Sequence, residues 1–268
     1  MSAPDAAAAV RRLVAFAVTH ARHAWWRTQD YAYVLVRQAE GALRRGGADA
    51  YLSGRTPPDV VLVPGVYESW QFMRPVARLL HAGGHAVHVL PTLGYNVGPI
   101  PAAASVLGAY LRAQDLRDVV VVAHSKGGLI GKLAMLREDP DGRIRSMVAI
   151  NTPFAGSAYA RWIPLASLRI FRPDDATLVA LAAEQEVNSR ITSVYAPWDP
   201  HIPAGSVLPG AANVELSTPG HFRPLADPRL ERVLLAAVRG DSGQPAPGAG
   251  EVAAADRAAD PPAERRAG

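Results

Sequence analysis

The feature that most constrains the fold is an alternation of short buried strands with amphipathic helices, which begins at Asp59. The runs "DVVLVP" at 59–64 and "DVVVVA" at 118–123 are continuously apolar, rich in β-branched residues and of strand length. Such runs are typical of strands buried on both faces. Longer amphipathic segments separate them, and one of these stops at Gly83 and Gly84. This alternation predicts a mostly parallel sheet covered by helices on both faces.

The same reading gives bounds for the remaining elements. Strands are expected at 59–64, 85–90, 118–123, 144–151, 190–197 and 212–217. Helices are expected at 10–45, 68–84, 100–114, 127–138 and 228–239. We therefore predict an N-terminal helical extension (1–55) and an α/β domain (56–239) with a less regular lid or cap at about 152–186. A disordered tail (240–268) is expected, because Val252 is its one large apolar residue.

Three residues with the chemistry of a catalytic triad follow predicted strands. Ser125 comes just after the strand at 118–123, and Asp199 and His221 come after the last two strands. In open parallel sheets the functional crevice lies beyond the carboxyl ends of the strands. A histidine can take the serine proton, and a carboxylate can hold the imidazole in the right tautomer. The order Ser, Asp, His therefore favours nucleophilic catalysis over the simpler role of Ser125 as a helix cap.

The residues around Ser125 fit a tight turn between a strand and a helix. Gly127 and Gly128 allow a close approach of the backbone. The backbone N–H of Lys126 is then expected to point at a developing oxyanion, with a helix N-terminus behind it. A second donor is expected in the loop after the first strand, at Val66. We expect the Lys126 side chain to pair with a carboxylate.

At this point the chain resembles a known family. Residues 59 to about 238 resemble an α/β-hydrolase and are similar to small bacterial lipases and esterases. The motif "AHSKGG" resembles the nucleophile elbow of some of them, with alanine at the first glycine position. "VLVPGVYES" resembles the oxyanion loop with Pro64 where histidine is common, and "INTPFAGSAYA" the start of a lid with Phe154 where histidine is frequent. "NVELSTPGHFRPL" resembles the last strand and the histidine loop.

The resemblance implies an α/β-hydrolase fold, with its lid or cap inserted after the region of the family's sixth strand. It implies Ser125, Asp199 and His221 as catalytic residues, and Lys126 and Val66 as backbone donors to the oxyanion. Asp174, Asp175 and Glu215 are alternative acids. The expected pocket residues are Tyr67, His124, Phe154, Trp162 and Trp198. We expect hydrolysis of lipid or other apolar carboxylic esters without a cofactor. Acyl transfer on the same scaffold and a non-catalytic lipid- or membrane-binding module are the alternatives.

Composition excludes several other functions. The chain has no cysteine, which excludes disulfides, thiol catalysis and thiolate metal sites. The formal charge of +4 lacks a basic patch with interleaved aromatic residues, so no nucleic-acid partner is expected. His85 and His88 would face opposite sides of a strand, and no metal site is expected.

The N-terminal segment leaves two interpretations open. Val14, Val18, Ala21 and Trp25 form one helical stripe. We expect this stripe to pack on the domain; the alternative is peripheral contact with anionic lipid, through this helix with Trp25 and Trp26 as anchors or through the lid. The apolar run is too short to span a bilayer, and no cleavage site follows it. A cytoplasmic location is therefore expected.

Overall fold

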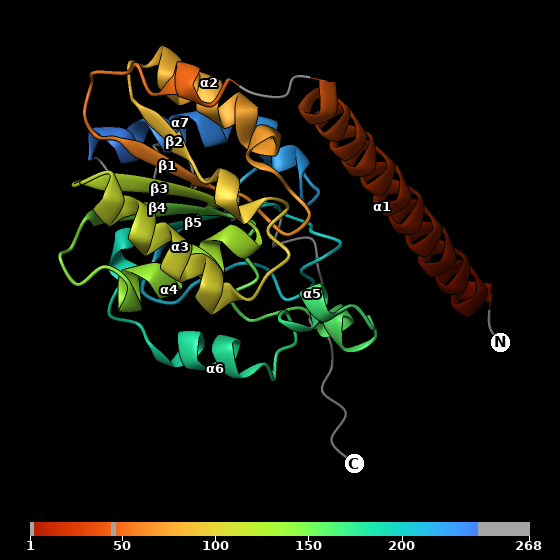
Figure 1. Ribbon diagram of the computed structural model, residues 1–268. Coiled ribbons are helices and arrows are strands. Elements are labelled where there is room, and N and C mark those ends of the chain that lie inside the picture. Colours follow the sequence, from red (N-terminus) through yellow and green to blue (C-terminus); the bar gives the residue numbers. More distant parts are fainter. Residues whose placement is uncertain (1–2, 44–46, 241–268) are drawn as a thin grey trace.

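A parallel six-stranded sheet forms the centre of the protein. The computed structural model describes residues 3–43 and 47–240 (Figure 1), and the predicted tail lies outside these residues except for Gly240. The strand order is β2-β1-β3-β4-β5-β6, and every neighbouring pair is parallel. The strands are β1 (Val60–Val63), β2 (Val87–Val89), β3 (Val119–His124), β4 (Ile144–Ile150), β5 (Ile191–Tyr195) and β6 (Ala212–Glu215).

Helices cover both faces of this sheet (Figure 1). The α-helices of the described residues are α1 (Ala3–Leu43), α2 (Arg74–Ala82), α3 (Ile100–Ala113), α4 (Lys126–Arg137), α5 (Ala166–Arg169), α6 (Ala176–Ala183) and α7 (Pro228–Arg239). Short 3₁₀ helices occur at Asp49–Tyr51, Trp70–Met73, Pro91–Leu93, Ala158–Arg161, Asn188–Arg190 and Arg223–Ala226. The predicted fold class, with its N-terminal helix, is confirmed.

The alternating side chains of the strands build one core on each face of the sheet. On β3, Val119 and Val121 pack with residues of α3 and α4, whereas Val120 and Val122 pack with residues of α2 and α7. All four side chains are fully buried. Burial on both faces explains why the sequence of this strand is a continuous apolar run and not an alternating one.

Helix α1 lies along one side of the body (Figure 1) and packs with a different face from the one predicted. Val14, Val18 and Trp25 are 56%, 61% and 61% exposed, so the prediction that their stripe packs on the domain is wrong. Asp30 is buried and Trp26 half-buried on the side that contacts the body. Tyr33 and Val34 also pack against the core between α2 and the sheet. Residues 9–18 are all exposed, so the apolar stripe that begins there has no part of the body to pack on, which is why hydrophobic periodicity selected the wrong stripe.

The insertion after β4 contains a 3₁₀ helix and the short helices α5 and α6. Phe171, Leu178 and Leu181 anchor it in the core on the α4 side of the sheet. None of the helices in the described part of the chain has the length and hydropathy needed to cross a bilayer.

Candidate active site

Ser125 occupies a strained turn between β3 and α4. Its backbone has φ 51° and ψ −118°, a conformation that residues with a side chain rarely adopt. A Cβ atom on Gly127 would lie 2.1 Å from the carbonyl oxygen of Val63, and one on Gly128 would lie 2.0 Å from Oγ1 of Thr152. Both glycines are therefore needed to let α4 start this close to the ends of the neighbouring strands.

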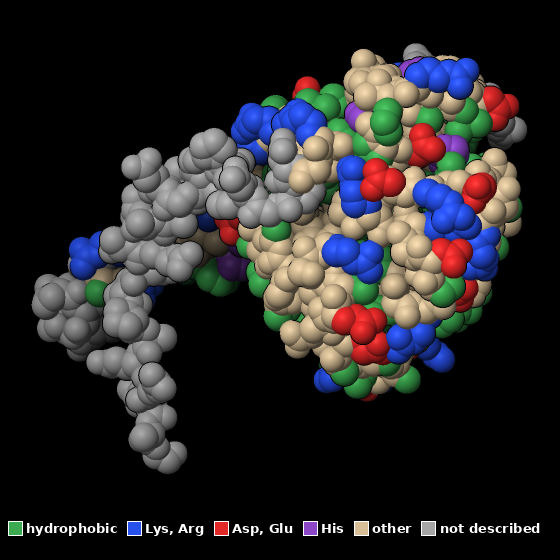
Figure 2. All heavy atoms as spheres, turned by 90° about the vertical axis from the view of Figure 1, so that its left-hand side faces the viewer, with side chains coloured by type: hydrophobic (Ala, Val, Ile, Leu, Met, Phe, Trp, Pro, Cys, Tyr) green, Lys and Arg blue, Asp and Glu red, His purple; other side chains and the backbone are tan. Residues whose placement is uncertain are grey.

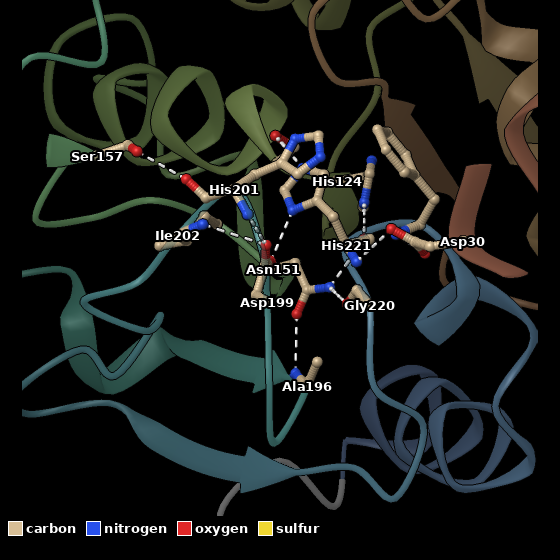
Figure 3. A network of polar contacts seen from close by, with 12 residues as sticks. Asp30, His124, Asn151, Ser157, Ala196, Asp199, His201, Ile202, Gly220 and His221 are labelled. Atoms are coloured by element: carbon tan, nitrogen blue, oxygen red, sulfur yellow. Dashed lines mark hydrogen bonds and ion pairs between the residues drawn. The ribbon is translucent and has the colours of Figure 1, made fainter. Parts of the chain in front are cut away.

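The structure brings Ser125, His221 and Asp199 together in a hydrogen-bonded line, and Figure 3 shows His221 and Asp199. Nε2 of His221 lies 2.9 Å from Oγ of Ser125, and Nδ1 lies 2.7 Å from Oδ2 of Asp199. The other oxygen of Asp199 accepts the backbone N–H groups of His201 at 2.7 Å and Ile202 at 3.1 Å. All three side chains are buried or nearly so, and this is the geometry of a nucleophile, a base and an orienting acid.

The two charged partners shift each other's pKa. Burial alone would lower the pKa of His221, but the charge and hydrogen bond of Asp199 outweigh it and raise this pKa above its ordinary value. Burial alone would raise the pKa of Asp199, but the charge and hydrogen bond of His221, together with the His201 N–H, lower it. Asp199 is therefore ionised, and His221 becomes an effective base only as pH rises through its raised pKa.

The alternative acids lie elsewhere. Asp174 pairs with Arg172, and Asp175 caps α6 by accepting the N–H of Thr177 at 2.9 Å. Glu215 is exposed on β6. Asp199 is the carboxylate that contacts the histidine ring.

The two predicted oxyanion donors come from the first turn of α4 and from the loop after β1. Lys126 is the first residue of α4, where backbone N–H groups have no acceptor within the helix. Val66 lines the same cavity as Ser125. Its loop is held by two hydrogen bonds: Gly65 N–H donates to Glu68 at 2.7 Å, and Asn96 Nδ2 donates to the Pro64 carbonyl at 2.7 Å.

The Lys126 side chain has no carboxylate partner among the described residues, so the expected ion pair is wrong. The ammonium group is buried and donates to the carbonyl oxygens of Asn96 at 2.7 Å and Gly98. Burial lowers the pKa of Lys126 to about 8. Lys126 therefore ties the loop after β2 to the nucleophile turn, and the carbonyl groups that receive it could not be recognised from local sequence.

Two residues that the sequence analysis missed hold the His221 loop. Asp30 of α1 accepts the backbone N–H of His221 at 2.8 Å, and Asn151 donates to the His221 carbonyl at 2.8 Å (Figure 3). Asn151 also accepts the N–H of Ala196, which joins this loop to the segment leading to Asp199. The position of Asn151 directly after β4 was a signal for it, whereas Asp30 lies inside a helical pattern far from the sheet.

His124 is a structural link and not a pocket residue. Its Nδ1 lies 2.9 Å from Glu68, and its Nε2 lies 3.0 Å from the carbonyl oxygen of His221. The His124 ring is fully buried. It connects the oxyanion loop to the histidine loop.

A cavity of about 390 Å³ opens beside Ser125 and His221. Helix α1, the loop and 3₁₀ helix after β1, the insertion, and the loops that carry Asp199 and His221 supply its walls. These walls include Tyr31, Val34, Val66, Tyr67, Phe72, Ala160, Ile163, Leu168, Phe171, Ile202 and Phe222.

Tyr67 is the one predicted pocket residue that lines this cavity. Phe154 is buried in the core, as His124 is, and Trp162 is 86% exposed. Trp198 packs instead against His23 and Trp26 of α1.

Solved structures match the arrangement of strands and helices. The mature lipase BlEst2 of Bacillus licheniformis matches with a TM-score of 0.56 and 15% identity, over 68% of this chain and 91% of the lipase. MGS-MChE2, an alpha/beta hydrolase enzyme from the metagenome of lagoon sediments at Mar Chica in Morocco, matches with a TM-score of 0.52 and 12% identity, over 70% and 93% of the two chains. The chain has the α/β-hydrolase fold. No family model and no curated protein matches the sequence. The resemblance inferred from motifs is thus confirmed by architecture, at low sequence identity.

Proposed function

We propose that the chain is a serine hydrolase that cleaves carboxylic esters with apolar acyl groups. The observation that carries this proposal is the hydrogen-bonded line from Ser125 through His221 to Asp199 at the edge of the cavity. The largely apolar walls of the cavity support an apolar acyl group, because they offer few groups to solvate a charged one. The α/β-hydrolase neighbours, one of them named a lipase, also support it.

The chemistry proceeds in two halves. Oγ of Ser125 attacks the ester carbonyl while His221 takes its proton, and the N–H groups of Lys126 and Val66 stabilise the oxyanion. The C–O bond to the alcohol then breaks, and His221 gives its proton to the departing oxygen. A water molecule, deprotonated by His221, attacks the acyl-enzyme and releases the acid and free Ser125. An alcohol in place of this water would give acyl transfer.

A panel of chromogenic esters from acetate to palmitate tests this function. We expect turnover to be highest for short and medium acyl chains and to fall for palmitate. The reason is that a cavity of about 390 Å³ is near the small end of ligand pockets, which span roughly 300–1,000 Å³. An activated fluorophosphonate should label Ser125, and added alcohols should reveal any acyl transfer. A folded protein that neither labels nor turns over any ester would be a binding module, and the proposal would fail.

A further inference from the structure

Asp30 is the one buried side chain among those described on α1, and it is 0% exposed. Its carboxylate accepts the backbone N–H of His221 at 2.8 Å (Figure 3). It also accepts the next two backbone N–H groups, from Phe222 and Arg223, at 2.9 Å each. Gln29 beside it accepts from the Arg223 side chain at 2.7 Å. Helix α1 therefore binds the loop that carries His221, and His221 lies 191 residues after Asp30 in the chain.

The loop is shaped to receive this carboxylate. Gly220 has φ +117°, and a Cβ atom placed on it would lie 2.4 Å from Oδ1 of Asp30. A side chain at this position would displace the Asp30 carboxylate from the loop. The hydrogen bonds to Asp30 fix the backbone of His221, while Asp199 and Ser125 contact its ring.

We propose that Asp30 is a positioning residue that holds His221 in line with Ser125, so that α1 is part of the active site. This inference rests on the proposed hydrolase function. A misplacement of about 1 Å at a reacting group can cost about 100-fold in rate. We therefore expect Asp30→Asn, which turns one acceptor oxygen into a donor, to lower kcat by about 10- to 100-fold and to change KM less than about threefold. The negative charge of Asp30 raises the pKa of His221. Asp30→Asn removes this charge, so the acid limb of kcat/KM should also move to lower pH.

Asp227→Asn is the matched control. Asp227 is also buried and also accepts backbone N–H groups, from Thr218 and Arg229, but it does not contact His221. Both variants are assayed below their unfolding temperatures, with thermal unfolding measured in parallel. If wild type turns over esters and Asp30→Asn loses no more activity than Asp227→Asn, or shows an unmoved pH profile, the positioning role is overturned. An inactive wild type would instead overturn the hydrolase proposal.

A second inference comes from the opposite side of α1. Eight exposed aliphatic or tryptophan side chains, which we call the outer face, lie about 100° or more around the helix axis from Asp30, at 100° per residue: Val10, Leu13, Val14, Val18, Trp25, Leu35, Val36 and Leu43. Leu13 and Leu35 are 68% and 71% exposed. An exposed apolar stripe of this length along a helix marks a contact surface for another molecule.

Three exposed arginines flank the outer face: Arg11, Arg22 and Arg27 lie about 60–100° around the helix axis from Asp30, whereas Arg12 lies on the Asp30 side. Residues 6–29 contain four arginines and no acidic residue, and Arg11, Arg12, Arg22 and Arg27 are all exposed. The side of the body away from α1 instead has acidic and basic groups interspersed (Figure 2). An apolar face with a tryptophan and flanking arginines matches the chemistry of helices that lie in the interface of an anionic membrane.

We propose that the outer face of α1 docks on an anionic lipid surface. Because Tyr31, Val34 and Gln38 of the same helix line the cavity, docking would hold the cavity near the lipid. This proposal does not depend on ester hydrolysis. It is tested with the full chain carrying Ser125→Ala, so that lipid stays intact.

Flotation with vesicles of phosphatidylglycerol and phosphatidylcholine, against phosphatidylcholine alone, measures the binding. We expect binding to the anionic vesicles that weakens with salt. Arg11→Gln with Arg22→Gln should weaken it about 30-fold at low salt, from about 1 kcal/mol per arginine, and Leu13→Glu with Trp25→Glu at least tenfold. Val179→Glu with Val207→Glu, which change exposed apolar residues of the body, should bind as wild type.

Three results would overturn the docking proposal. The first is that the protein binds both kinds of vesicle equally well. The second is that Leu13→Glu with Trp25→Glu binds anionic vesicles as tightly as the protein without these two changes. The third is that the protein sediments as a dimer and binds no vesicles. A dimer that Leu13→Glu with Trp25→Glu dissociates would show that a second copy of the chain covers the outer face.

Discussion

Ser125→Ala is expected to lower kcat for ester turnover by about 10⁵- to 10⁶-fold. The hydroxyl is the only atom at this turn that can form the acyl-enzyme, and His221 and Asp199 act on the reaction through it. Removing it leaves only substrate binding and the oxyanion donors, so nearly all catalysis is lost. The loss is measured by steady-state turnover of the best chromogenic ester at a pH where His221 is neutral.

The substitution should leave the fold intact, which makes it a clean test. Alanine keeps the hydrogen bond from the backbone N–H of residue 125 to the Ile150 carbonyl and introduces no new atom. Thermal unfolding and circular dichroism should match those of wild type, and fluorophosphonate labelling should disappear. A residual activity within tenfold of wild type would show that Ser125 is not the nucleophile.

Asp199→Asn is expected to lower kcat by about 10⁴-fold. The amide can present its N–H₂ group to Nδ1 of His221, which would put the ring proton on Nε2 and leave no lone pair to accept the Ser125 proton. The substitution also removes the charge that raises the pKa of His221. The acid limb of the remaining kcat/KM profile should therefore move to lower pH, since the free imidazole persists further into acid.

Glu215→Gln is the matched control for Asp199→Asn. Glu215 was an alternative acid, but it is exposed on β6, and its neutralisation should change kcat less than about twofold. Equal losses from the two substitutions would contradict the assignment of Asp199, as would a loss at Asp199 without a shift of the acid limb. The KM values separate effects on substrate binding from effects on the chemistry.

The His221 loop is held in place by groups from distant parts of the chain. Asp30 holds the backbone N–H of the loop, Asn151 and His124 bind its carbonyl, and Asp199 holds the ring. These groups come from α1, the ends of β3 and β4, and the loop after β5. Each of these four side chains forms a hydrogen bond to the His221 loop, which belongs to another element. A buried hydrogen-bond network of this kind favours one conformation of the loop.

The sequence by itself determined the sheet and the placement of Ser125, Asp199 and His221 at strand ends. This was possible because strands buried on both faces must be apolar throughout, and parallel strands bring their carboxyl ends to one edge. The tertiary structure alone decided the roles of Asp30, Lys126 and the His124–Glu68 pair, and which side of α1 meets the body. Hydrophobic periodicity reports burial within an element, but a hydrogen bond such as that between Asp30 and His221 depends on how distant segments meet.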